Sequence, residues 1–123
     1  MKYLLDSNII IYHLNGEESA TGFITANREH CAISRISYIE VLSFDFTPDE
    51  ENAVRELLDG FFIIDTNREI ANQSVKNRKN KKIKVPDNII ASSAQVYDLT
   101  LVTRNINDFD SLDVKILDII TEG

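Results

Sequence analysis

The sequence predicts an α/β protein of three layers, an α/β/α sandwich in which helices cover both faces of a mainly parallel five-stranded sheet. Two observations favour this fold. Short apolar runs alternate with longer segments of helical periodicity, which indicates parallel strands joined by right-handed crossovers. The runs are also bounded by polar residues, as expected for buried strands. The predicted strands are a run that ends at Leu5 and the runs 31–33, 61–64, 100–103 and 114–117.

The helices predicted in the first half of the chain are marked by their end signals. A densely apolar segment over 7–15 ends at an Asn-Gly pair, and the segment 17–27 begins with acids that suit the positive end of a helix dipole. The Ser-x-x-Glu spacing of Ser37 and Glu40 matches a capping box and predicts a helix that begins at this serine. A proline followed by three acids predicts a further helix over 48–58.

The second half adds two long helices and a short one. Residues 68–79 have helical periodicity and become basic toward the end, where cations are favoured. Residues 81–84 are predicted to be a loop, because a residue before proline is biased away from helical dihedrals. The next helix begins at Pro86, and its small residues over 91–94 predict close packing against the sheet. A short turn or helix is expected over 105–109.

Length and composition indicate a single soluble domain over 1–123. The chain is 43% hydrophobic and 27% charged, and it is long enough for one core and too short for two. Neither a signal-peptide pattern nor a run of roughly 18 apolar residues is present, so a cytoplasmic protein with no membrane segment is expected. The lone Cys31 excludes an internal disulfide and a thiolate zinc cage.

Positive charge is concentrated in residues 76–84 of an otherwise acidic chain. The net charge is −7, which argues against a surface generally coated with nucleic acid. A local basic patch can still steer a polyanionic substrate, although a solvated helix end is the simpler interpretation of such a segment. The residues predicted to bind nucleic-acid phosphates are Lys79, Lys81, Lys82 and Lys84, together with Arg104.

Four acids lie at or near the starts of helices or turns that follow a strand or loop: Asp6, Glu40, Asp87 and Asp108. For any one of them, helix capping is a sufficient explanation. Capping does not require the acids to converge, however, and ligands of open α/β sheets bind beyond the carboxyl ends of the strands. If these ends share one edge, we expect the four carboxylates to lie in one crevice.

Carboxylates that lie so close repel one another unless a cation neutralises them. Oxygen ligands without nearby His or Cys select a hard ion, so we expect Mg²⁺ or Mn²⁺ at this site. Such a site suits hydrolysis of a phosphodiester by metal-activated water. Ser7, Asn8, Thr103 and Asn105 are candidate supporting residues, with ordinary turn chemistry as the alternative interpretation.

Four motifs follow one another along nearly the whole chain: Leu4-Leu5-Asp6-Ser7-Asn8, Ser34-x5-Glu40, Val85-Pro86-Asp87-x-x-Ile90-Ala91 and Leu101-Val102-Thr103-Arg104-Asn105-x-x-Asp108-Phe109. Together they resemble the PIN-domain ribonucleases, above all the VapC-type toxins of bacterial and archaeal toxin–antitoxin modules. The resemblance implies a parallel sheet flanked by helices and an endonuclease that cleaves RNA with Mg²⁺ or Mn²⁺. It also implies a homodimer and inhibition by a small VapB-like antitoxin whose C-terminal segment reaches the active site.

By position, Asp6, Glu40 and Asp87 match the acidic residues of the family. The fourth acid is ambiguous, because many members have Asp where this chain has Asn105, whereas others have an acid at the position of Asp108. We favour Asp108 as the ligand, directly or through water, with Asn105 in a supporting role. Ser7 replaces the commoner threonine and keeps the hydroxyl group.

The leading hypothesis is therefore a metal-dependent endoribonuclease, with two alternatives from other classes. A small phosphatase can use Asp6 as a covalent nucleophile, but this scheme usually has a second acid two residues later, where Asn8 stands. A non-catalytic binding module can carry the same acids as helix caps only. In that case Mg²⁺ would not stabilise the protein, because only a ligand of the native state raises its stability.

Overall fold

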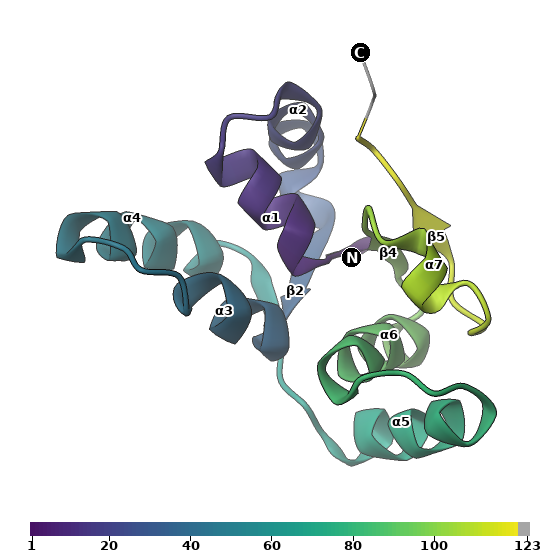
Figure 1. Cartoon of the computed structure of the whole chain (residues 1–123). Helices are drawn as coiled ribbons and strands as arrows, with labels where there is room; N and C mark the ends of the chain where they lie inside the picture. The colour runs from purple at the N-terminus through teal and green to yellow at the C-terminus, as the bar shows by residue number, and fades with distance from the viewer. Residues whose placement is uncertain (121–123) are drawn as a thin grey trace.

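The computed structural model describes residues 1–120 and is shown in Figure 1; residues 121–123 of the predicted domain lie outside the described part. The elements follow one another as β1 (Tyr3–Leu5), α1 (Ser7–Leu14), α2 (Glu18–Asn27), the 3-10 helix η1 (Arg28–His30), β2 (Cys31–Ser34), α3 (Arg35–Leu42), α4 (Pro48–Asp59), β3 (Phe62–Ile64), α5 (Arg68–Asn80), α6 (Val85–Tyr97), β4 (Thr100–Val102), α7 (Ile106–Phe109) and β5 (Ile116–Leu117). No helix within residues 1–120 is long and apolar enough to cross a membrane.

The strands form one parallel sheet in the order β3-β2-β1-β4-β5, so the first strand of the chain lies at its centre. Leu4 is paired with Ala32 on one side and with Leu101 on the other. The five-stranded parallel sheet predicted from the sequence is therefore confirmed. Because all strands run in the same direction, the residues that follow β1, β2 and β4 emerge at one edge.

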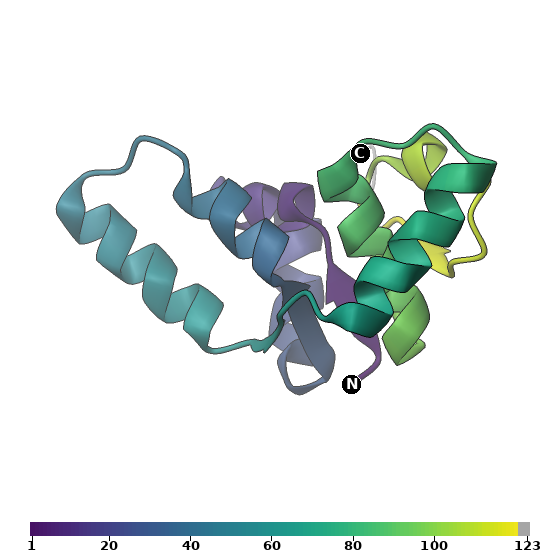
Figure 2. The ribbon, with the colours of Figure 1, turned by 90° about the horizontal axis from the view of Figure 1, so that it is seen from below.

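Consecutive residues of β1 belong to different hydrophobic clusters, one on each face of the sheet, as the pleat of a strand requires. Leu4 packs in a cluster with residues of α5, α6 and α7, whereas Leu5 packs with residues of α1, α2, α3 and α4. Figure 2 shows the two helix groups on either side of the strands, with α3 and α4 extending away from the sheet. This arrangement confirms the three-layer sandwich.

Helix α3 begins two residues earlier than predicted. Ser34, in extended conformation at the end of β2, caps it by accepting the backbone N–H of Ile36 at 3.0 Å. Ser37 consequently lies inside the helix, fully buried, and does not pair with Glu40. The predicted capping box is wrong because β2 passes directly into α3 and the first serine already fills the cap position.

Buried amide and hydroxyl groups join α5 to α6. The side-chain amide of Asn77 donates to Asn88 Oδ1 at 3.1 Å, Ser92 Oγ at 3.1 Å and Gln95 Oε1 at 2.8 Å. Asn88 in turn donates to the backbone oxygen of Ser74 at 2.8 Å. The small residues of α6 therefore serve both the sheet, as predicted, and a hydrogen-bonded contact with α5 that sequence patterning did not indicate.

Candidate active site

Asp6 lies at the centre of the carboxyl edge of the sheet, between β1 and α1, and is only 5% exposed. Its Oδ1 accepts the backbone N–H of Ser7 at 2.8 Å, so the residue is the N-cap of α1. Its Oδ2 accepts the hydroxyl of Thr103, which follows β4, at 2.8 Å. Both carboxylate oxygens are thus held by groups that follow the neighbouring strands β1 and β4.

The Thr103 hydroxyl connects the predicted supporting residues to Asp6. It accepts the side-chain amide of Asn8 at 3.3 Å and the backbone N–H of Asn105 at 3.0 Å. Asn8 Oδ1 also accepts the backbone N–H of Arg104 at 3.4 Å. The structure therefore brings Asn8, Thr103 and the main chain of Asn105 together behind the carboxylate.

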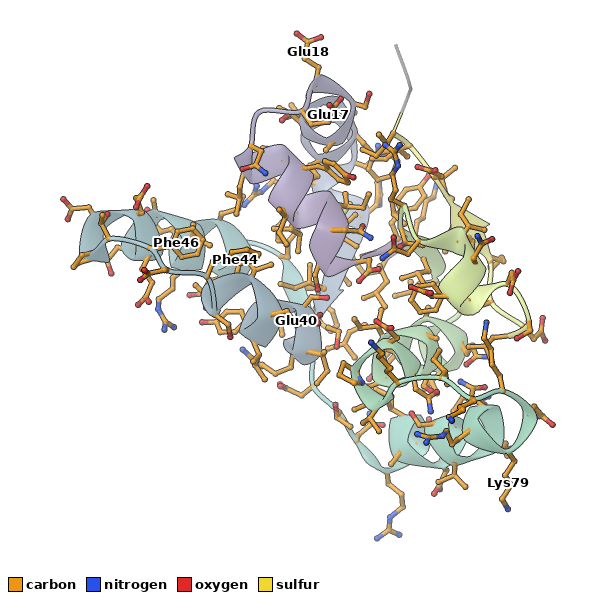
Figure 3. The ribbon with its side chains drawn as sticks, in the orientation of Figure 1. Glu17, Glu18, Glu40, Phe44, Phe46 and Lys79 are labelled. Carbon is orange, nitrogen blue, oxygen red and sulfur yellow. The ribbon has the colours of Figure 1, made fainter. Side chains whose placement is uncertain are left out.

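Glu40 approaches the same place from α3. The Ser7 hydroxyl donates to Glu40 Oε1 at 2.5 Å, a short distance that is typical of a hydrogen bond to a charged acceptor. Figure 3 shows Glu40 on the side of α3 that faces α1. Ser7 thus links the glutamate of α3 to the helix that Asp6 caps, which is a role the sequence prediction did not give it.

The pKa values show that the acids act on one another. The pKa of Asp6 is raised from 3.8 to about 6, mainly by burial and in addition by the charges of Asp87 and Glu40, against the effect of its two hydrogen bonds. Partial burial also raises the pKa of Asp87, and so do the charges of Asp108 and Glu40, although Lys84 opposes them. The four predicted acids therefore form one electrostatic cluster, in which Glu40 and Asp87 act on the buried Asp6, and Asp108 acts on Asp87.

The donor chemistry of this cluster fits a hard divalent cation. As the side chains stand, no three His, Cys, Asp or Glu residues within 1–120 are arranged to hold an ion between them. Mg²⁺, however, keeps several of its waters and takes only one or two protein carboxylates directly. The pKa values of Asp6 and Asp87 are raised mainly by burial and in addition by the neighbouring acids, and a bound cation would favour the charged form of both groups.

Cationic residues flank the acids on two sides. A cavity of about 240 Å³ is lined by Lys81, Lys82, Ile83, Lys84, Asp87, Asn107 and Asp108. Lys79 is exposed at the far end of α5, where Figure 3 shows it directed away from the acids. A second cavity, of about 390 Å³, is lined by Arg104, Asn105, Ile106, Asn107 and Asp108.

Comparison with known proteins identifies the family. The model of the PIN domain matches residues 3–115. The chain belongs to the PIN-domain family. The PIN domain predicted from four sequence motifs is thereby confirmed. A search of curated protein sequences gave no match.

Solved structures resemble this PIN domain over nearly its whole length. A toxin–antitoxin complex from Klebsiella pneumoniae is 34% identical with a TM-score of 0.85, and the match covers 95% of this chain and 97% of that chain. VapBC2 from Rickettsia felis, bound to a DNA fragment from its promoter, is 25% identical with a TM-score of 0.80 over 95% and 98% of the two chains. VapBC-1 from nontypeable Haemophilus influenzae shares the fold at 22% identity, with a TM-score of 0.80 over 98% and 100%.

Proposed function

We propose that this PIN domain is a metal-dependent endoribonuclease and the toxin of a toxin–antitoxin pair. The observation that carries the proposal is the electrostatic cluster of Asp6, Glu40, Asp87 and Asp108 at the carboxyl edge of the sheet. Structures described as toxin–antitoxin and VapBC complexes resemble the chain over nearly its full length, which supports the toxin assignment. A small VapB-like antitoxin is therefore the proposed protein partner, and a homodimer is the proposed assembly.

Asp6 and Asp87 would hold Mg²⁺ or Mn²⁺, with Glu40 and Asp108 as further ligands, directly or through water. When bound, the metal polarises the phosphate and lowers the pKa of a water that attacks phosphorus. Asp6 is well suited to this role because bonds from Ser7 and Thr103 fix both of its oxygens before any ligand arrives. Such preorganisation keeps the carboxylate in position while charge develops on the phosphate.

The basic residues would hold the RNA backbone without reading its bases. Lys82 and Lys84 are exposed and share a cavity with Asp87, so a phosphate bound there lies beside the acids. Arg104, which lines the second cavity together with Asp108, would extend the contact, and Lys79, at the far end of α5, would meet a more distant part of the RNA. Contacts of this kind position a nucleic acid but carry no base code, so cleavage specificity has to come from other groups.

Cleavage of RNA by the purified chain tests the proposal. We expect cleavage with Mg²⁺ or Mn²⁺, loss of cleavage with a chelator, and more than about 100-fold slower cleavage by Asp6→Ala and Asp87→Ala. Asp45→Ala is the matched control, because this acid is exposed in the loop between α3 and α4. Cleavage by both folded variants at the wild-type rate would contradict the proposal.

The phosphatase alternative gains no support from the geometry. Asn8, which stands where a second acid is usual, is hydrogen-bonded to Thr103 and Arg104. Trapping a phosphorylated Asp6 would nevertheless favour that reaction over RNA hydrolysis, because the two schemes differ in whether Asp6 becomes covalently modified.

A further inference from the structure

The four residues that join α5 to α6 alternate between inward and outward positions. Lys81 is half-buried and Ile83 is 5% exposed, whereas Lys82 and Lys84 are exposed. The backbone is extended at Lys81 and at Lys84, and successive side chains of an extended segment point to opposite sides. The lysines of this segment therefore fall into two groups, although they are neighbours in the sequence.

Lys81 uses its ammonium group within the protein. Its Nζ donates to the backbone oxygen of Asn107 at 3.2 Å and lies 3.4 Å from Oδ1 of Asp110. Its side chain is 20% exposed, and that of Asp110 is 59% exposed. Asn107 and Asp110 lie on α7 and at its C-cap, on either side of Asp108. One ammonium group thus holds the short helix that carries the fourth acid.

The same inward side of the segment is also held by apolar packing. Ile83 and Phe109 belong to one buried cluster, on the Leu4 face of the sheet. The 81–84 segment and α7 are consequently joined twice, once through this core and once through Lys81. Asp87, at the start of α6, and Asp108, on α7, line the cavity between them.

We propose that Lys81 is a positioning residue that ties α7 to the 81–84 segment and so sets the separation of Asp108 from Asp87. This assignment rests on the proposed function, because it concerns how two of its metal ligands are placed. It removes Lys81 from the lysines that hold RNA and leaves Lys82 and Lys84 in that role. The bond to Asn107 and the ion pair with Asp110 carry the proposal, because they direct the ammonium group of Lys81 toward α7.

Lys81→Met and Lys82→Met separate the two roles, because both keep an apolar stem and remove one charge. For Lys81→Met we expect half-maximal thermal stabilisation at an Mg²⁺ concentration about three- to tenfold higher than in the wild type. This effect is at or below the loss of metal affinity that is usual when a group bonded directly to a metal-ligating residue is removed. We also expect faster backbone hydrogen exchange over 105–110. Lys82→Met should change neither quantity. The exchanged pair Lys81→Asp with Asp110→Lys should recover part of the Mg²⁺ response lost in Lys81→Met.

Binding of a labelled single-stranded oligoribonucleotide in chelator gives the second readout. Lys82→Met should reduce the slope of log affinity against log salt by about 0.7, the value for one phosphate contact on a single strand, and Lys81→Met should not. A wild-type Mg²⁺ midpoint in Lys81→Met would overturn the positioning role. A wild-type protein whose stability does not respond to Mg²⁺ would instead refute the proposed function, and with it the role given to Lys81.

Discussion

Removing the charge of Asp6 is expected to stabilise the metal-free protein while it abolishes cleavage. The substitution Asp6→Asn keeps an oxygen that can accept the backbone N–H of Ser7, so the cap of α1 is retained. It also relieves the repulsion from Asp87 and Glu40. A residue that served only as a helix cap would give no such gain in stability.

The magnitude follows from the pKa of Asp6, which the fold raises from 3.8 to about 6. Between these values the native state keeps a proton that the unfolded state has lost, so stability falls as the pH rises through this window. A difference of about two pH units corresponds to roughly 3 kcal/mol. The hydroxyl of Thr103 loses its carboxylate acceptor in the variant, which costs about 1 kcal/mol. The expected net gain at pH 7.5 is about 2 kcal/mol.

Urea denaturation of chelator-treated protein between pH 4 and pH 8 measures this effect. We expect wild-type stability to fall across the window set by the pKa of Asp6, and the stability of Asp6→Asn to change much less there. Asp45→Asn, at an exposed acid, is the control. Adding Mg²⁺ should stabilise the wild type and leave Asp6→Asn unchanged. A variant that is less stable than the wild type at pH 7.5 without metal would refute this reasoning.

Three further predictions concern buried polar groups and the fourth acid. Asn77→Ala should lower the free energy of unfolding by about 2 to 3 kcal/mol in urea, because several buried polar groups lose their partner; an effect below 1 kcal/mol would contradict this. Ser37→Ala should raise the free energy of unfolding by roughly 1 kcal/mol, because the buried Ser37 hydroxyl has no hydrogen-bond partner among the described residues. A loss of stability in this variant would show that the hydroxyl does have a partner. Asp108→Ala should raise the Mg²⁺ concentration needed for cleavage by about tenfold, and Asn105→Ala by less, because Asn105 acts through its backbone; equal effects would contradict this distinction.

The residues at the carboxyl edge of the sheet can be predicted from the sequence, because the end of each strand is marked by neighbouring residues in the chain. Each strand is a short apolar run, and in a parallel sheet the residues that follow β1 and β4 necessarily emerge together. The approach of Asp6 to Thr103, across 97 positions in the chain, follows once β1 and β4 are neighbours in the sheet. Helical periodicity over 68–79 and the small residues over 91–94 likewise predicted two helices, and both pack on the Leu4 face of the sheet.

Choices between equivalent local patterns could not be predicted. Ser34, Ser37 and Glu40 are spaced by three residues, so either serine matches a helix start, and only the length of β2 decides between them. The local sequence does not indicate the partners of Lys81 either. Asp110 lies 29 residues away, and nothing in a lysine-rich run distinguishes one ammonium group from the next. Such pairings depend on how α7 packs, which no periodicity encodes.

Two neighbouring helix caps show why Asp6 requires an explanation beyond capping. Asp6 follows β1 and Ser34 ends the adjacent strand β2, and their backbone dihedrals are nearly the same, with φ −71° and ψ 157° for Asp6 and φ −74° and ψ 148° for Ser34. Serine and aspartate cap helices about equally well. Ser34 does so while 1% exposed and without a charge, whereas Asp6 places a carboxylate where burial and two other acids oppose its ionisation. The charge at position 6 is thus unnecessary for the fold and unfavourable to it, which is the property expected of a carboxylate kept to bind a cation.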